Sequence, residues 1–394
     1  MTSAILSFVT LTSLSLASAT GQSEPDVRLR RVPGDGVQPQ IVVEGETCHL
    51  LSFQGAPEAG DLFYRRVSLD GEVRGAALRV NSQEGSAIAV GTIRGGQMAL
   101  GADGRLHVAW NGSARAEPKG PKNPAIDADS PYNGLPMLYT RLSDDGAFEP
   151  QRNLMTRTFS LDGGGSIAAD GHGNVWVAWH ASSPQSKAGE AGRRVWLAQS
   201  KDSGETFERE RPIGEEGLGA CGCCGMRLMA TRAGDLFALY RAATEGVRRD
   251  VVLLAPKDGG DFEARKLHPW RIESCPMSSM SLLAADSRVL CAWETDGQVH
   301  YGEFDVASRR VGLVAAAPGD NRSRKHPVLA RNEAGQVLLA WSEGTGWQKG
   351  GAVAWQVFDA EGKPTANRGR EEGVPVWGSV TAFSRPDGDF VILY

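Results

Sequence analysis

The sequence has no long hydrophobic run after its first 23 residues, so no later segment is apolar enough to cross a bilayer as a helix. It also has no excess of basic residues. The 42 Lys and Arg are outnumbered by 47 Asp and Glu, the net charge is −5, and the two signs are interspersed. A nucleic-acid-binding protein presents a concentrated basic surface, so we expect neither a nucleic-acid partner nor a membrane span.

The N-terminal segment contains no Lys or Arg, although it otherwise has the character of an export signal. Its apolar, hydroxyl-rich run ends in Ala17-Ser18-Ala19, the small-x-small pattern of a cleavage site. We therefore expect residues 1–19 to be a signal peptide and the protein to be secreted or periplasmic. No cysteine follows the cleavage site, so a lipid anchor is not expected. An oxidising compartment would permit disulfides.

Glycine is abundant, with 49 residues, and the chain has 10 tryptophans. One pattern recurs: an apolar strand, a turn with Asp, Asn or Gly, and a second apolar strand that ends in an aromatic residue. The aromatic residues that mark the copies are Phe53, Trp110, Trp179, Tyr240, Trp293, Trp341 and Tyr394. A period of about 50 residues built from strands indicates a β-propeller, in which each blade is a four-stranded sheet whose strands A to D run outward from the axis.

The repeats predict an all-β chain with one propeller domain over residues 26–394. The copies of the pattern favour seven blades, and six remain an alternative. Because the last copy ends the chain, its blade needs a strand from elsewhere, and Asp26–Val32 is the obvious donor. Pairing the N-terminal strand with the C-terminal hairpin would close the ring and remove exposed sheet edges.

A turn motif in the third repeat supports this assignment. Residues 200–207 read SKDSGETF, which resembles the Asp box of the sialidase-like propellers, and residues 142–149 and 256–263 are degraded copies. In such a turn the Asp accepts backbone N–H bonds, the Gly adopts positive φ, and the aromatic residue packs under the hairpin. The motif indicates architecture and carries no catalytic information.

In a propeller the D-to-A and B-to-C loops emerge at one end of the axis, and the unusual residues of this sequence fall in those loops. We expect one mouth to carry the following residues: Arg94, Asn111, His180, Arg241, Glu273, Glu294, Asp296, Arg322, His326, Glu343, Trp347 and four cysteines. Loops on a rigid scaffold are where binding and catalysis usually occur. For each single residue the alternative is a structural hydrogen-bonding role near the axis.

The cysteines allow three interpretations. Cys48 and Cys291 fall within B strands and are expected to be buried, which leaves Cys221, Cys223, Cys224 and Cys275 at the mouth. An exported protein favours disulfides, either between neighbouring blade loops or as a vicinal pair. The alternatives are a Cu or Zn site completed by Met226, Met277 or His326, and a redox dithiol. The CxCC spacing differs from the spaced CxxC pairs of zinc motifs.

The repeats, the Asp box and segments such as GACGCCGM, CPMSS and EGTGWQKGG resemble secreted bacterial exo-alpha-sialidase-like (BNR-repeat) proteins over nearly the whole mature chain. That resemblance implies arginines that bind a substrate carboxylate, a Tyr–Glu nucleophile pair and an Asp general acid. The candidates for the arginines are Arg94, Arg241 and Arg322. The nucleophile pair would be Tyr240 with Glu294 or Glu273, and the acid would be Asp162. The alternative for Tyr240 is that it replaces the core Trp of the other repeats.

Three functions follow. The resemblance favours a secreted glycoside hydrolase of sialidase type, without a cofactor, that acts as a monomer on an acidic or complex glycan. In this reading His180, His326, Glu343 and Trp347 help to bind the substrate. The second function is a non-catalytic propeller that binds a glycan, another small molecule or a protein. The third is a periplasmic copper-binding protein that uses the cysteine cluster. Fold alone does not separate them.

Overall fold

The computed structural model describes residues 24–394, except residues 160, 187–188 and 320–322. The predicted signal peptide and Arg322 lie outside the described residues. Within them, no helix is long and apolar enough to cross a membrane.

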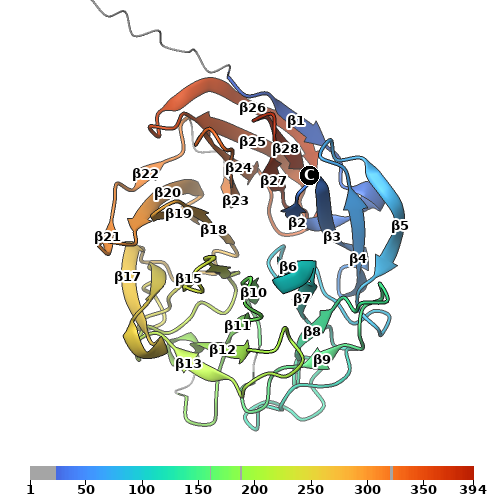
Figure 1. The fold of residues 1–394 in the computed structure, drawn as a ribbon. Helices are drawn as coiled ribbons and strands as arrows, with labels where there is room; N and C mark the ends of the chain where they lie inside the picture. The colour runs from blue at the N-terminus through green and yellow to red at the C-terminus, as the bar shows by residue number, and fades with distance from the viewer. Residues whose placement is uncertain (1–23, 160, 187–188, 320–322) are drawn as a thin grey trace, which may run out of the picture.

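The described chain forms seven β-sheets arranged as blades around a central axis (Figure 1). Blade one contains β2 (Val37–Glu44), β3 (Thr47–Ala56), β4 (Ala59–Val67) and β5 (Val73–Arg79). Blade two contains β6 (Gln97–Leu100), β7 (Leu106–Asn111), β8 (Met137–Arg141) and β9 (Arg152–Asn153). Blade three contains β10 (Ser166–Ala169), β11 (Val175–Ala181), β12 (Arg194–Ser200) and β13 (Arg211–Ile213).

The next three blades follow the same order from the axis outward. Blade four contains β14 (Arg227–Ala230), β15 (Leu236–Arg241), β16 (Val251–Pro256) and β17 (Phe262–His268). Blade five contains β18 (Met280–Ala285), β19 (Arg288–Thr295), β20 (Gln298–Asp305), β21 (Arg310–Val311) and a further strand on β20, β22 (Ala315–Ala316). Blade six contains β23 (Arg324–Arg331), β24 (Val337–Glu343), β25 (Gly351–Phe358) and β26 (Pro364–Val374). Helical structure in the described residues is limited to short 3-10 turns: η1 (Pro33–Asp35), η2 (Ala102–Gly104), η3 (Glu190–Gly192) and η4 (Asp258–Gly260).

Blade seven joins the two ends of the chain. It consists of β27 (Thr381–Ser384), β28 (Phe390–Leu393) and β1 (Val27–Arg30), and β1 runs parallel to β28. The innermost strands β2, β6, β10, β14, β18, β23 and β27 each contact those of the adjacent blades, so the ring is closed. The predictions of seven blades and of closure by the N-terminal strand are confirmed, and the alternative of six blades is wrong. Blade seven has three strands rather than the expected four.

The second strand of each blade lies between two neighbouring sheets and is buried on both faces. In β11 all seven residues, VWVAWHA, are buried. Trp110, Trp179 and Trp293 are among the largest fully buried side chains, which confirms that the repeated aromatic residue fills the space between blades. Packing of this kind fixes the ends of these strands around the axis.

The Asp-box turn of blade three has the expected local structure. The Asp202 carboxylate accepts hydrogen bonds from the Thr206 N–H at 2.9 Å and from the Ser200 hydroxyl at 2.6 Å. Phe207 packs edge-on against Tyr139 of blade two at a centroid distance of 4.8 Å, and the Tyr139 hydroxyl is 2.8 Å from Nδ1 of His107. The turn therefore joins two blades as well as two strands.

Candidate functional site

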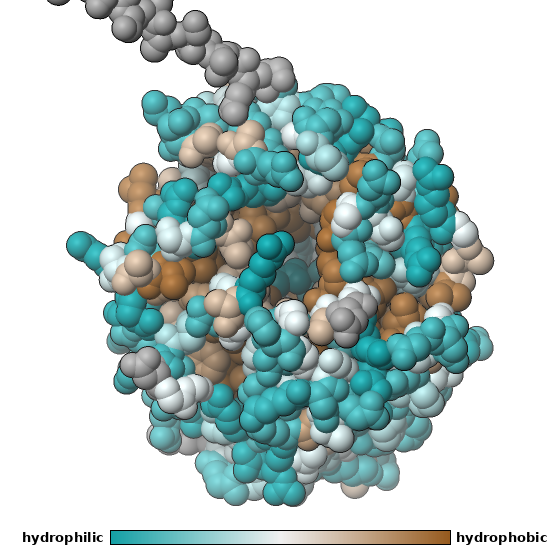
Figure 2. All heavy atoms as spheres, in the orientation of Figure 1, coloured by the Kyte–Doolittle hydropathy of each residue, from teal (hydrophilic) through white to brown (hydrophobic). Residues whose placement is uncertain are grey.

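Loops from several blades meet at one end of the axis, as the sequence predicts. The β13–β14 loop with the cysteines is bonded to the β17–β18 loop through Gly225 N–H and the Ser278 carbonyl, at 2.9 Å. It is bonded to the end of β15 through Cys221 N–H and the Arg241 carbonyl, also at 2.9 Å. Viewed along its axis, the ring has a hollow centre (Figure 2).

The Gly163-Gly164-Gly165 run allows the loops to approach this closely. A Cβ at Gly163 would lie 2.3 Å from the Cys224 carbonyl oxygen and 2.7 Å from Nδ1 of His180. A Cβ at Gly164 would lie 1.5 Å from the Ile93 carbonyl oxygen. Asn111, at the end of β7, holds this run with its side-chain amide, which donates to the Gly163 carbonyl at 3.0 Å. Any side chain at Gly163 or Gly164 would force the β9–β10 loop away from the cysteines.

The three cysteines of the β13–β14 loop form one buried cluster. Sγ of Cys221 is 3.4 Å from Sγ of Cys223 and 3.4 Å from Sγ of Cys224, and all three sulfurs lie within 4.8 Å of one another. Met277, from the β17–β18 loop, packs against them. We call Cys221, Cys223 and Cys224 the thiol cluster.

The predicted disulfides are not formed, because all six cysteines of the chain are described and all six are free. Cys275 is exposed, and the residue of its loop that packs against the thiols is Met277. The expected tie between the two loops is therefore made by packing and by backbone hydrogen bonds. Cys48 and Cys291 are buried, as predicted.

Charged groups around the thiol cluster favour one thiolate. Hydrogen bonds from the Cys221 and Cys223 thiols, together with the nearby Arg241 guanidinium, lower the pKa of Cys224 well below its usual range. Hydrogen bonds to the other two sulfurs, and burial, raise the pKa of Cys223. Arg241 is fully buried, and its guanidinium donates to the carbonyls of Arg249 (2.7 Å) and Glu294. Of the three sulfurs, that of Cys224 is therefore the one whose thiolate the surroundings favour most.

Several polar atoms beside the thiol cluster are buried without a partner among the described residues. Both ring nitrogens of His180 are in this state, and so are Oε2 of Glu294 and Nε of Arg241. Burial lowers the pKa of His180 to about 4 and raises that of Glu294. Buried polar groups are nearly always hydrogen-bonded, so unpaired ones around a cavity indicate a bound ion or water.

Other predicted site residues are committed to partners in the fold. Glu343 is buried; its Oε1 is 3.1 Å from Nε of Arg324, and its Oε2 is 3.0 Å from Nε of Arg370. Arg94 forms an ion pair with Asp162, and its Nε donates to the Asp162 carbonyl at 2.7 Å. The repeat pattern predicted that these residues lie at the mouth, but it did not predict their ion pairs.

Tyr240 lies in the hydrophobic core of blades three and four, where it occupies the position of the aromatic residue in the other repeats. Burial raises the pKa of Tyr240, and this environment does not suit a nucleophile. Glu273 is exposed on the β17–β18 loop. The structure therefore does not bring together the expected Tyr–Glu pair.

A cavity of about 70 Å³ adjoins the thiol cluster at the mouth. Ten residues line it: Gly91, Thr92, Cys275, Met277, Lys325, His326, Thr345, Gly346, Trp347 and Trp377. Trp347 and Trp377 meet edge to face at a centroid distance of 4.8 Å. Four of these residues, Cys275, Met277, His326 and Trp347, were expected at the mouth from the sequence. Trp377 was not, because the segment between blades six and seven that carries it does not match the repeated pattern. We call this cavity the mouth cavity.

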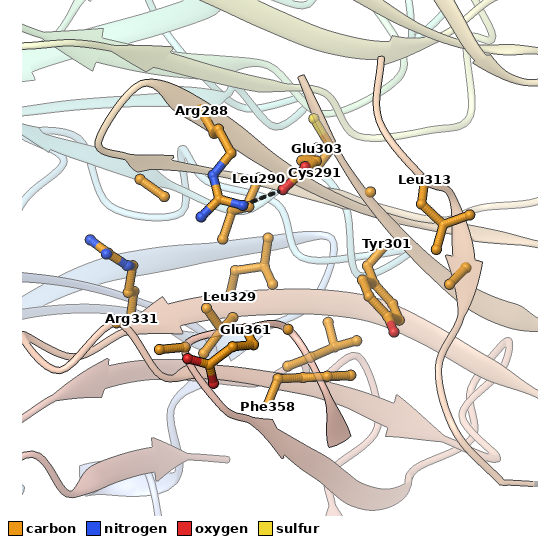
Figure 3. Close-up of a pocket in the computed structure, with 18 of the residues that line it drawn as sticks. Arg288, Leu290, Cys291, Tyr301, Glu303, Leu313, Leu329, Arg331, Phe358 and Glu361 are labelled. Carbon is orange, nitrogen blue, oxygen red and sulfur yellow. Dashed lines mark hydrogen bonds and ion pairs between the residues drawn. The ribbon is translucent and has the colours of Figure 1, made fainter. Parts of the chain in front are cut away.

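A larger pocket, of about 260 Å³, lies between blades five and six (Figure 3). Its lining includes the A–B turns of both blades and the C–D turn of blade six, so it opens at the end opposite the mouth. Figure 3 shows Arg288 paired with Glu303, at 2.8 Å, above an apolar floor that includes Leu290 and Phe358. None of the predicted mouth residues lines it.

No protein-family model matches the chain, and no curated protein matches it in sequence. Several solved propellers are similar in structure. The sialidase Hz136, described as a Hadza microbial sialidase, aligns with a TM-score of 0.50 and 14% identity over 83% of this chain and 69% of its own. A triple-arginine mutant of AofleA from Arthrobotrys oligospora aligns with a TM-score of 0.51 and 8% identity over 86% and 87%. The NanB sialidase from Streptococcus pneumoniae aligns with a TM-score of 0.49 and 9% identity over 82% and 76%.

The fold of the chain is similar to that of known sialidases. At these identities the likeness concerns the fold, and an activity has to be argued from the site.

Proposed function

We propose that this propeller binds a soft metal ion, in the first place Cu(I), at the thiol cluster. The observation that carries the proposal is the position of three buried sulfurs within 4.8 Å of one another at the mouth. Soft thiolate and thioether ligands select Cu(I), Zn or iron–sulfur clusters over harder ions.

The surroundings favour Cu(I) over Zn. Met277 packs against the sulfurs, and a thioether is a Cu(I) ligand but not one of the usual zinc ligands.

The spacing of the sulfurs is close to that of a metal-bound set. Sulfurs bound tetrahedrally to zinc at ~2.3 Å lie about 3.8 Å apart. The distance of 3.4 Å from Cys221 to each of its neighbours is within a few tenths of an ångström of such a spacing. Small outward movements of the thiols would therefore admit a metal.

The charge balance of the site also supports the proposal. Three thiolates and a monovalent cation carry a net charge of −2, which is costly to bury without compensation. The buried Arg241 guanidinium acts electrostatically on the Cys224 sulfur, and the buried Arg249, which is ion-paired with Glu190, acts on that of Cys221. The unpaired His180 nitrogens, neutral at pH 7, offer further ligands or water contacts.

Anaerobic titration of the reduced protein with Cu(I) against a chromophoric chelator tests this function. We expect stoichiometric binding, and a loss of about 100-fold or more in affinity in Cys221→Ser, because Cys221 contacts both other sulfurs. Cys48→Ala, which removes a buried thiol of blade one remote from the cluster, is the control and should bind normally. Failure of the wild type to compete with the chelator, or wild-type affinity in Cys221→Ser, would overturn the proposal.

Glycoside hydrolysis is the second candidate, favoured by one observation. Glu294 has a pKa raised by burial and an unpaired Oε2, as a general acid requires. The Asp162 side chain, ion-paired with Arg94, is 41% exposed at the mouth. It ranks second because Tyr240 is packed in a hydrophobic core, and Glu343 and Arg94 are held in ion pairs within the fold. A panel of fluorogenic glycosides, sialosides included, should then show turnover that Glu294→Gln abolishes. Turnover that survives in Glu294→Gln would remove this assignment. Export, on which both candidates depend in the cell, stays a prediction.

A further inference from the structure

We propose that the mouth cavity is the entry port of the metal site, which receives Cu(I) from a low-molecular-mass thiol complex and passes it by ligand exchange through Cys275 and Met277 to the thiol cluster. This inference rests on the proposed function. It adds the path and the chemical class of the donor.

Met277 connects the two places. Met277 lines the mouth cavity and also packs against the thiol cluster. Cys275, two residues earlier, lines the same cavity and is exposed to solvent. The loop thus presents one sulfur outward and the next sulfur inward, in the order that a metal would meet them.

His326 gives the cavity a third soft-metal ligand. It is only 4% exposed, and the Ser279 hydroxyl holds its Nδ1 at 3.0 Å, so Nε2 is the ring nitrogen that remains for a ligand. At the rim, the Lys325 ammonium donates to the Pro276 carbonyl at 2.7 Å, which fixes the Cys275–Met277 segment and places a positive charge where an anionic thiolate complex would arrive.

Backbone strain is concentrated around the cavity. Thr92 (φ 61°), Met277 (φ 48°), His326 (φ 53°) and Trp377 (φ 61°) all have left-handed backbones without being glycine. The described chain contains thirteen such residues, and four of them are among the ten that line this one small cavity. A left-handed backbone is strained for a residue other than glycine, and such residues cluster at functional sites. The fold holds these four side chains at the cavity against that strain.

The transfer needs no oxidant or reductant. A Cu–S bond to the donor thiolate breaks as a Cu–S bond to Cys275 forms, and the proton lost by Cys275 goes to the departing thiolate. The Met277 thioether then binds the ion as Cys275 leaves and takes back a proton from solvent. Cys224 finally binds the ion beside Met277, any proton on its sulfur goes to solvent, and the copper stays in the +1 state throughout.

Loading kinetics test the port separately from the site. Cu(I) bound to N-acetylcysteine is mixed anaerobically with the reduced protein, and the copper–thiolate absorption is followed in the ultraviolet. We expect Cys275→Ser to load at least tenfold more slowly than wild type with unchanged equilibrium affinity and stoichiometry. Met277→Leu, which keeps the volume and removes the thioether, should also load slowly.

Met280→Leu is the matched control, because Met280 is buried on β18 outside the cavity, and it should load at the wild-type rate. Wild-type loading rates in both Cys275→Ser and Met277→Leu would overturn the port. A weakened equilibrium affinity in Cys275→Ser would also overturn it, by making Cys275 a resident ligand. Absence of Cu(I) binding by the wild type would instead defeat the proposed function itself.

Discussion

Glu343 is a buried carboxylate whose role depends on residues far from it in the chain. Its two oxygens are shared among Arg324, Arg370 and the indole N–H of Trp341. The repeat pattern correctly placed Glu343 at the end of a B strand, facing the mouth. It could not reveal that Arg370, on the outermost strand of the same blade, reaches back to it. For the same reason Arg94 and Asp162 were predicted as separate site residues and are found as an ion pair.

We expect Glu343→Gln to lower the free energy of unfolding by about 3 kcal/mol, because the change leaves the buried Arg324 guanidinium without its counter-charge. Urea unfolding followed by tryptophan fluorescence measures this. Glu361→Gln, an exposed change in the C–D turn of the same blade, should shift stability by less than about 0.5 kcal/mol. Equal effects of the two substitutions would argue against a structural role for Glu343.

The Asp-box turns show how far local sequence determines an element. The order of Ser, Asp, Gly and aromatic residue predicted the turn, and the turn is formed in blades two and three. The partner under the aromatic ring belongs to the preceding blade: Phe148 packs on Tyr64 and Phe207 packs on Tyr139. That contact depends on how two blades pack, so the motif alone could not supply it.

Two left-handed glycines, one in each of these turns, separate backbone strain from inter-blade packing. A Cβ at Gly204 (φ 78°) would lie 1.8 Å from the Tyr139 hydroxyl, whereas one at Gly146 (φ 83°) would meet nothing within 4 Å. Gly146→Ala should cost about 1 kcal/mol for its left-handed backbone, and Gly204→Ala about 3 kcal/mol, because it also displaces Tyr139 from His107. Chemical denaturation of both variants compares them, and similar costs would contradict the inter-blade role.

Closure of the ring is the feature of the whole molecule that the sequence predicted best. Seven copies of one pattern, with the last copy lacking its outer strands, left the N-terminal strand as the partner. Register, the parallel direction of β1 and the three-stranded form of blade seven came only from the structure. The loops that carry the cysteines lie at one mouth, as predicted. That Met277 rather than Cys275 contacts the thiol cluster depends on the conformation of the β17–β18 loop, which the sequence did not reveal.

A chain that begins at Arg31 should be less stable than one that begins at Glu24 by at least about 3 kcal/mol, because it loses the pairing of β1 with β28 and the packing of Val27 and Leu29. Calorimetry of the two chains measures the difference. The shorter chain also exposes the edge of β28, so light scattering should detect association that the longer chain does not show. Identical unfolding and scattering would mean that β1 contributes nothing to closure.

Buried histidines give the molecule a predictable response to acid. Burial lowers the pKa of His107 to about 3, of His180 to about 4 and of His326 to about 3. In the unfolded chain they titrate near 6.5, so between about pH 6.5 and pH 4 the unfolded state binds more protons. The free energy of unfolding should be flat above pH 7 and fall below pH 6.5, by up to about 1.4 kcal/mol per pH unit for each histidine.

Urea midpoints at several values between pH 7.5 and pH 4.5 measure this slope. In His180→Gln the contribution of His180 to the pH dependence of the free energy of unfolding should be lost, so the slope should become shallower. A stability that does not change across this range would contradict the burial of the three imidazoles as neutral groups.

The parallel pairing of β1 with β28 also has a consequence for synthesis. The Asp26 amide bonds to the Asp389 carboxylate across 363 positions of the chain. At ~5–20 residues per second, a ribosome needs roughly 20–70 s to travel that distance. For that time the first strand to be made has no partner. Six sheets can assemble as they emerge, but the seventh waits for the final segment, which makes the earliest strand the last one to find its place.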